Sequence, residues 1–145
     1  MAAYEKILAT LDFGSGSEVV YERATELAKI YSTKLLLLHV VEYVPVDLGS
    51  DFMLPGPLEI EESLVARARE NLADKVKALD DIDVVSNVEI GVTKLEIIRY
   101  ADDNQVDLIV IGRHSRQGIF KLLGSTANAV LHHAHCDVLA VNIAE

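Results

Sequence analysis

The chain has 145 residues, half of them hydrophobic, and 13 Lys and Arg residues against 23 Asp and Glu residues give it a net charge of −10. This is the length of one ordinary domain that buries a core without a metal or a disulfide, so we expect a single domain over residues 1–145. The acidic excess argues against nucleic acid or an anionic membrane as the partner. A lone cysteine, the absence of a secretory signal pattern and the absence of an apolar run of ~20 residues favour a cytoplasmic protein.

The first half of the chain predicts a strand, a helix and a second strand. A short aliphatic run at 6–11 predicts a strand, and the glycines and serines at 12–17 predict a turn. Ser15 and Glu18 form a capping-box signature for a helix with apolar residues at helical spacing. These residues are Val20, Ala24, Leu27, Ala28 and Tyr31. The continuous apolar run Lys34–Val41 predicts a strand covered on both faces, as in a parallel sheet.

The second half continues the alternation of helices and strands. A loop of about 17 residues leads into a charge-rich helix at 59–79, with one apolar face and one solvated face. Val84–Ile90 predicts a strand, and Thr93 and Glu96 form a second capping-box signature for a helix at 93–104. Residues 108–111 predict a strand that ends at Gly112. A last helix and a strand at 138–141 follow. The apolar residues of the helix at 59–79 are Leu64, Ala68, Leu72, Val76 and Leu79, and those of the last helix are Ala127, Val130, Leu131 and Ala134. This order predicts one parallel sheet with right-handed crossovers and helices on both faces.

Ligands of such sheets bind beyond the carboxyl ends of the strands, where the strand order reverses. That rule selects the segments 12–17 and 112–126. The second segment contains three of the eight glycines, and Gly124, Ser125 and Thr126 lead into the last helix, as in an anion cradle.

Charge supports the anion cradle independently of the glycines. Residues 108–136 include no Asp or Glu over 29 positions, but they include Arg113, Arg116 and Lys121. The glycines also fit ordinary turns, and the basic residues also fit a solvated surface or one that contacts a partner. Asp12, at the end of the first strand, fits either a ligand hydroxyl or amine or an ordinary turn.

Several separated motifs carry a resemblance to a known family. They are ILATLD at 7–12, LLHV at 37–40 and DLIVIGRH at 107–114, followed by GST at 124–126. The chain resembles the universal stress protein family over its whole length, and residues 127–141 are similar to the A-type, UspA-like bacterial members. The resemblance implies an α/β domain with a five-stranded parallel sheet and helices on both faces, which is Rossmann-like and adenine nucleotide alpha hydrolase-like. It also implies a role in surviving stress and a cytoplasmic homodimer paired through the last strand, which includes Val138 and Val141.

Family members that bind ATP have the pattern Gly-x2-Gly-x9-Gly-Ser/Thr, and this chain departs from it twice. Ser115 replaces the second glycine, and eight residues separate Ser115 from Gly124 instead of nine. A serine adds a Cβ where a phosphate must approach, and the shorter spacer shifts the amides that follow. By family position, the resemblance implies a site for ATP, with Mg²⁺, that consists of Asp12, Val40, Gly112, Ser115, Gly124, Ser125 and Thr126.

Three functions therefore stay open. The first is a dimeric stress-response regulator that binds an adenine nucleotide through the loop at 112–126. The second is a nucleotide-independent homodimer that acts through contacts with unknown protein partners, and the two departures favour it. The third is a weak ATPase in which Asp12 holds Mg²⁺. The chain has no Walker lysine and no evident base, so we expect no enzyme. The acidic excess predicts no nucleic-acid partner and no membrane partner.

The histidines and the cysteine are predicted to be structural. His132 and Cys136 stand four residues apart, but the helix is expected to end before Cys136, so no metal site is predicted. Cys136 is expected to pack as a small hydrophobic side chain. His39 is expected to be a buried, hydrogen-bonded histidine, and His114, in the glycine loop, is the one histidine that merits a functional test.

Overall fold

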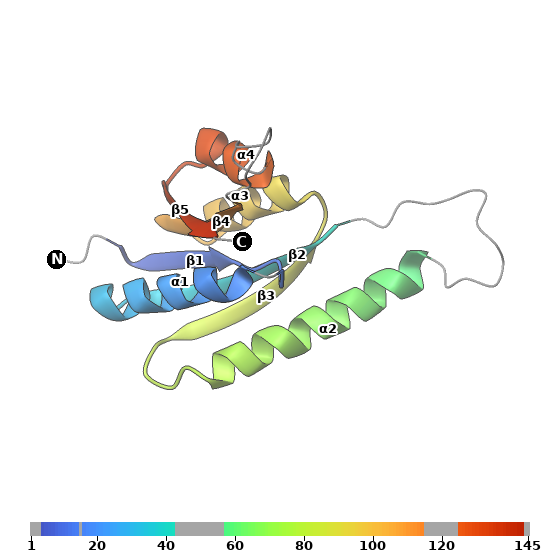
Figure 1. The fold of residues 1–145 in the computed structure, drawn as a ribbon, viewed down its shortest axis with the longest axis horizontal. Coiled ribbons are helices and arrows are strands. Elements are labelled where there is room, and N and C mark those ends of the chain that lie inside the picture. Colours follow the sequence, from blue (N-terminus) through green and yellow to red (C-terminus); the bar gives the residue numbers. More distant parts are fainter. Residues whose placement is uncertain (1–3, 15, 43–56, 115–124, 144–145) are drawn as a thin grey trace.

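A computed structural model describes residues 4–14, 16–42, 57–114 and 125–143, and these form a single five-stranded parallel sheet with helices on both faces (Figure 1). The elements in chain order are β1 (Lys6–Thr10), α1 (Ser17–Tyr31), β2 (Lys34–Val41), α2 (Pro57–Lys77), β3 (Val84–Ile90), α3 (Thr93–Asp103), β4 (Leu108–His114), α4 (Ser125–His133) and β5 (Asp137–Ile143). The predicted alternation and fold class are confirmed. No helix within these ranges is both long and apolar enough to cross a membrane.

The strand order is β3-β2-β1-β4-β5, so the order reverses between β1 and β4. All four pairings are parallel; Thr10 lies opposite Leu38, and Ala9 lies opposite Val110. The carboxyl ends of β1 and β4 therefore leave a crevice at the switch point, which is where ligands of such sheets bind.

Alternating side chains of the central strands supply two cores. Ile7 and Leu37 belong to a core beneath α1 and α2, whereas Leu8 and Leu36 belong to a core beneath α3 and α4. β2 has six of its eight residues buried, because helices cover both of its faces. The prediction of a fully covered second strand is confirmed.

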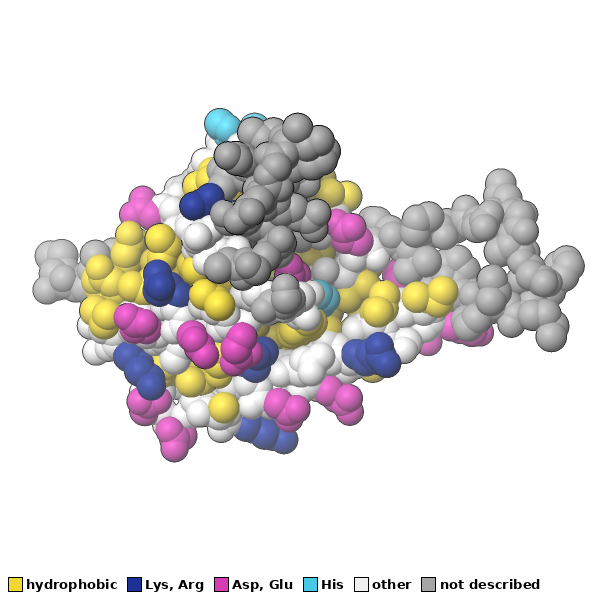
Figure 2. Space-filling model, in the orientation of Figure 1, with side chains coloured by type: hydrophobic (Ala, Val, Ile, Leu, Met, Phe, Trp, Pro, Cys, Tyr) yellow, Lys and Arg dark blue, Asp and Glu magenta, His cyan; other side chains and the backbone are white. Residues whose placement is uncertain are grey.

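The long helix α2 packs on the sheet with part of its length. Ala68 and Leu72 are buried, but Leu64 is 40% exposed because the N-terminal turns of α2 extend past the sheet (Figure 1). Charged side chains of both signs are interspersed over the face formed by α1 and α2 (Figure 2). The predicted solvated face of this helix is thus observed, but its predicted apolar face is buried only from Ala68 onward.

Three local predictions are wrong. β4 does not end at Gly112 but continues to His114, because Gly112 and Arg113 pair with β5. The N-cap of α1 is Gly16 and not the predicted Ser15, which lies outside the described residues. The N-cap of α3 is Val92, which makes no side-chain capping bond, so the box predicted at Thr93 and Glu96 does not form. The Thr93 hydroxyl instead donates to Glu42 at 2.7 Å.

Candidate functional site

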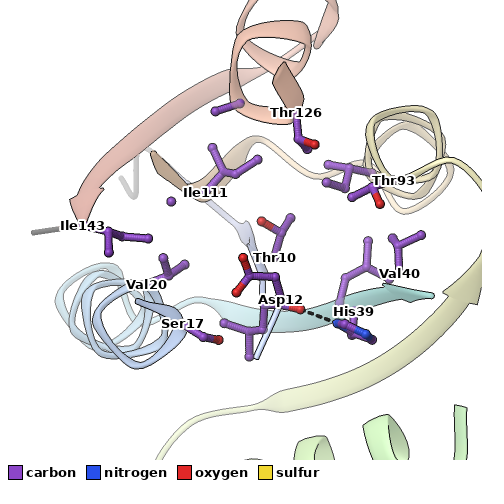
Figure 3. A pocket seen from close by; sticks show the side chains of 15 residues that line it. Thr10, Asp12, Ser17, Val20, His39, Val40, Thr93, Ile111, Thr126 and Ile143 are labelled. Carbon is purple, nitrogen blue, oxygen red and sulfur yellow. Dashed lines mark hydrogen bonds between the residues drawn. The ribbon is translucent and has the colours of Figure 1, made fainter. Parts of the chain in front are cut away.

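The carboxyl ends of β1, β2 and β4 and the starts of α1, α3 and α4 enclose a cavity of about 310 Å³ (Figure 3). Its volume lies at the lower end of the range of small-molecule sites in proteins. The lining residues are Thr10, Leu11, Asp12, Ser17, Val20, Leu38, His39, Val40, Thr93, Ile97, Ile111, Gly112, Thr126, Ala127 and Ile143. The cavity therefore lies at the switch point selected from the sequence.

Asp12 serves both as a turn residue and as a lining residue of the cavity. One of its carboxylate oxygens, Oδ1, accepts a hydrogen bond from the Gly14 amide at 2.8 Å, which closes a turn of the kind that Asp favours. The side chain is exposed and borders the cavity. Both sequence interpretations of Asp12, turn and ligand acceptor, are compatible with this geometry, because the turn bond uses one carboxylate oxygen.

His39, near the end of β2, makes two contacts with the segment that contains Asp12. Its Nδ1 lies 2.6 Å from the carbonyl oxygen of Leu11, and a carbonyl only accepts, so Nδ1 is the protonated nitrogen of the ring (Figure 3). The Phe13 ring lies over the imidazole, with 4.4 Å between the ring centroids. His39 is hydrogen-bonded, as predicted, but it is half-buried and not buried, and it lines the cavity, which the sequence did not indicate.

Gly112 lies against Ile143, the last residue of β5. A Cβ placed on Gly112 would overlap Cδ1 of Ile143 and would come within 3.0 Å of Val20. A Cβ on Gly16 would also overlap the side chain of Ile143. Both glycines thus make room for one buried isoleucine. This packing explains the absence of a side chain at Gly112 without any reference to a phosphate.

Three helices begin at the cavity with hydroxyl side chains: Ser17 in α1, Thr93 in α3 and Thr126 in α4. Helix N-termini have a partial positive charge and unpaired amides, which attract anionic groups. Among the described residues that line the cavity, Asp12 is the one carboxylate, and none is Lys or Arg. The described part of the cavity is thus mainly apolar, with hydroxyl groups at the helix starts.

The structure brings together four of the seven predicted site residues. Asp12, Val40, Gly112 and Thr126 line one cavity, although they come from four different segments. Ser125 is the first residue of α4, and its side chain lies outside the described part of the structure. Ser115, Gly124 and the side chain of His114 also lie outside it, as do Arg116, Gly118 and Lys121.

The histidine-rich stretch lies between the end of α4 and the start of β5, at the amino ends of the strands and away from the cavity. α4 ends at His133, so Cys136 is not on the helix and does not share a face with His132, as predicted. Cys136 packs against the core beneath α3 and α4, and burial raises the pKa of its thiol to about 11. Within the described ranges, no group of three or more His, Cys, Asp or Glu side chains is arranged to hold a metal ion.

The parallel sheet with this strand order and helices on both faces defines the Rossmann-like α/β class of proteins. The sequence model of the universal stress protein family matches residues 3–142, and the chain belongs to this family. One relative, universal stress protein A homolog 1 of Coxiella burnetii, is 38% identical over 138 residues, which is 95% of this chain and 96% of the relative.

Solved structures confirm the fold. The universal stress protein UspA from Lactobacillus plantarum superposes with a TM-score of 0.81 at 23% identity, over 97% of this chain and 99% of that one. A universal stress protein solved in complex with cAMP superposes with a TM-score of 0.67 at 23% identity, over 97% of this chain and 98% of that one.

Proposed function

We propose that this universal stress protein is a stress-response regulator that binds an adenine nucleotide in the cavity between β1 and β4. One observation carries the proposal. Asp12, Val40, Gly112 and Thr126, which match the family's nucleotide-site positions, come from four separate segments and line the same cavity. The universal stress protein solved with cAMP shows that this fold accommodates an adenine nucleotide in another member.

The described lining fits a nucleoside. Leu38, Val40, Ile97 and Ile111 offer an apolar surface for a flat base, as is usual in small-molecule sites. The free carboxylate oxygen of Asp12 can accept a hydrogen bond from a ribose hydroxyl or an adenine amine. The phosphate groups would lie toward the start of α4, and Mg²⁺ would enter bound to them, because Mg²⁺ usually binds through substrate phosphates.

Binding without catalysis is the function that we propose, with weak ATP hydrolysis as the third candidate. Phosphoryl transfer needs cationic groups on the phosphates and a residue that activates the nucleophile. The described lining residues include no Lys or Arg to neutralise the phosphates, and the groups that could act as a base are the Asp12 carboxylate and Nε2 of His39. This composition supports binding rather than hydrolysis. The binding role that we propose is in the cytoplasm, where a nucleotide signal would be available.

We also propose a homodimer paired through β5. β5 is an edge strand that pairs with β4 alone within the described sheet, and Val138, Leu139 and Ala140 are half-buried. A free apolar edge is a template for another strand, and a two-fold axis would pair it with its own copy. Sedimentation at micromolar concentration should show a dimer, and a monomer would contradict this part of the proposal.

Nucleotide binding is tested directly on the purified protein. Mass spectrometry of the denatured protein should detect a released adenine nucleotide, and calorimetric titration of the stripped protein with ATP and Mg²⁺ should give saturable binding. Asp12→Ala should lower the affinity about tenfold, because a hydrogen bond to a charged group contributes about 1.5 kcal/mol. Asp81→Ala, which removes an exposed carboxylate outside the cavity, is the matched control.

The outcomes separate the candidate functions. Binding that Asp12→Ala weakens and Asp81→Ala leaves unchanged supports the nucleotide site. Equal affinities for both variants would place the nucleotide elsewhere. The absence of both released nucleotide and titration heat would overturn the proposal in favour of the second candidate, a homodimer that acts through contacts with protein partners.

A further inference from the structure

The imidazole of His39 holds the residues on both sides of Asp12. On the N-terminal side, His39 Nδ1 donates to the Leu11 carbonyl at 2.6 Å. On the C-terminal side, the Phe13 ring stacks on the imidazole, with 4.4 Å between the centroids and a tilt of 31°. Asp12 is therefore flanked by two residues that contact the same side chain of the neighbouring strand.

These contacts fix the backbone from which the Asp12 side chain projects. The Leu11 carbonyl and the Asp12 amide belong to one planar peptide unit, so a hydrogen bond to the carbonyl sets the orientation of that unit. Phe13 has a φ of 60°, a left-handed conformation that non-glycine residues rarely adopt. Phe13 stacks on His39 and also packs against the core beneath α1 and α2, and these contacts favour this conformation.

β1 itself does not hold Asp12. The strand ends at Thr10, and one more backbone hydrogen bond to β2 follows, in which the Leu11 amide donates to the Leu38 carbonyl at 2.8 Å. Beyond this bond, Asp12 depends on its own turn with Gly14 and on the contacts that His39 makes. The direction of the carboxylate at the cavity is thus set jointly by the turn with Gly14 and by a side chain of β2 that holds the neighbouring residues.

We infer that His39 is a positioning residue that aims the Asp12 carboxylate into the nucleotide cavity. The inference rests on the proposed function, because it concerns the affinity of that same site. His39 acts through its Nδ1 donor, and Asn offers an amide N–H at nearly the same position. Leu matches the bulk of the ring more closely but donates no hydrogen bond.

The test is a mutant cycle read by calorimetric titration with ATP. His39→Leu should lower the affinity about fivefold, the equivalent of one hydrogen bond, and His39→Asn should restore most of it. In an Asp12→Ala background, His39→Leu should change the affinity less than twofold, because the carboxylate that it orients is gone. His135→Leu, at the amino ends of the strands and outside the cavity, is the matched control, and thermal melts verify that each variant is folded.

An independent measurement needs no nucleotide. A long-range ¹H–¹⁵N spectrum of the unliganded protein should show His39 with its proton on Nδ1. A proton on Nε2 alone would remove the bond to Leu11 and overturn the inference.

The remaining outcomes are also distinct. Equal losses from His39→Leu with and without Asp12 would mean that His39 does not act through Asp12, and failure of His39→Asn to restore affinity would exclude the donor role. If the wild-type protein binds no nucleotide at all, the proposed function fails and this inference falls with it.

Discussion

Substitution of Gly112 by alanine separates two explanations for this glycine. In an open strand position, alanine in place of glycine stabilises a protein by about 0.5 to 1 kcal/mol. At Gly112 the new Cβ would overlap Cδ1 of Ile143 and would lie within 3.0 Å of Val20. Ile143 borders the cavity, so its Cδ1 can turn aside, but Val20 Cγ2 at 3.0 Å and Ile143 Cγ1 at 3.4 Å would still crowd the new Cβ, and the overlap is relieved only in part. Overpacking of this kind costs about 1 to 3 kcal/mol, so we expect Gly112→Ala to destabilise the protein by about 2 kcal/mol.

The compensating substitution is Ile143→Val, which deletes the Cδ1 atom that the new Cβ would meet. By itself it should cost about 1 kcal/mol, as is usual for removal of a buried methyl group. With valine at position 143, Gly112→Ala should cost about 0.5 kcal/mol. The cycle should therefore show a coupling energy of about 1.5 kcal/mol between the two positions.

Urea unfolding at one fixed protein concentration measures the cycle, and a fixed concentration is needed because dimerisation would add to the apparent stability. In thermal melts, Gly112→Ala should lower the melting temperature by about 6 °C. A coupling energy near zero would refute the packing explanation. A neutral or stabilising Gly112→Ala that nevertheless abolishes nucleotide binding would instead favour backbone approach by a phosphate.

Two further predictions concern α2 and Cys136. Leu72→Ala should lower the free energy of unfolding in urea by about 3 kcal/mol, because Leu72 is 1% exposed. Leu64→Ala should lower it by about 0.5 kcal/mol or less, because that side chain is 40% exposed. Equal costs would mean that a partner covers the start of α2. The pKa of Cys136 is raised from 9.0 to about 11, mainly by burial, so the thiol should react slowly with a disulfide reagent at pH 8. Because the folded state holds the thiol proton more tightly, the contribution of Cys136 to the free energy of unfolding is complete below pH 9 and is lost as the pH rises toward 11. If the free energy of unfolding of Cys136→Ala depended on pH in the same way as that of the wild-type protein, this prediction would be contradicted.

The fold could be predicted from the sequence because strand and helix patterns agree with one another along the whole chain. The continuous apolar run of β2 predicted a strand covered on both faces, and the structure has helices on both faces. Element ends were predicted less well. Gly112 looked like the end of β4, yet its pairing with Val141 of β5 continues the strand. That pairing joins residues of two different strands, and a local pattern does not reveal it.

The capping box predicted at Thr93 and Glu96 illustrates the same limit. Thr93 and Glu96 have the right spacing, but the Thr93 hydroxyl donates to Glu42 at 2.7 Å, and Glu96 accepts from Arg99 at 2.6 Å. Each side chain has a partner elsewhere that competes with the helix amides. Local spacing indicated that a helix begins near Thr93, but it did not show which groups satisfy its first turn.

The candidate site divides in the same way between local and distant information. Asp12 and Gly112 could be identified because each lies near the carboxyl end of a strand at the switch point, where the topology alone predicts a crevice. His39 and Ile143 could not, because their roles depend on contacts with residues 28 and 31 positions away, namely Leu11 and Gly112. A glycine after a strand is therefore compatible with a phosphate cradle and with a neighbouring side chain that needs its space. Only the contact across the sheet distinguishes these explanations, and for Gly112 that contact is with Ile143.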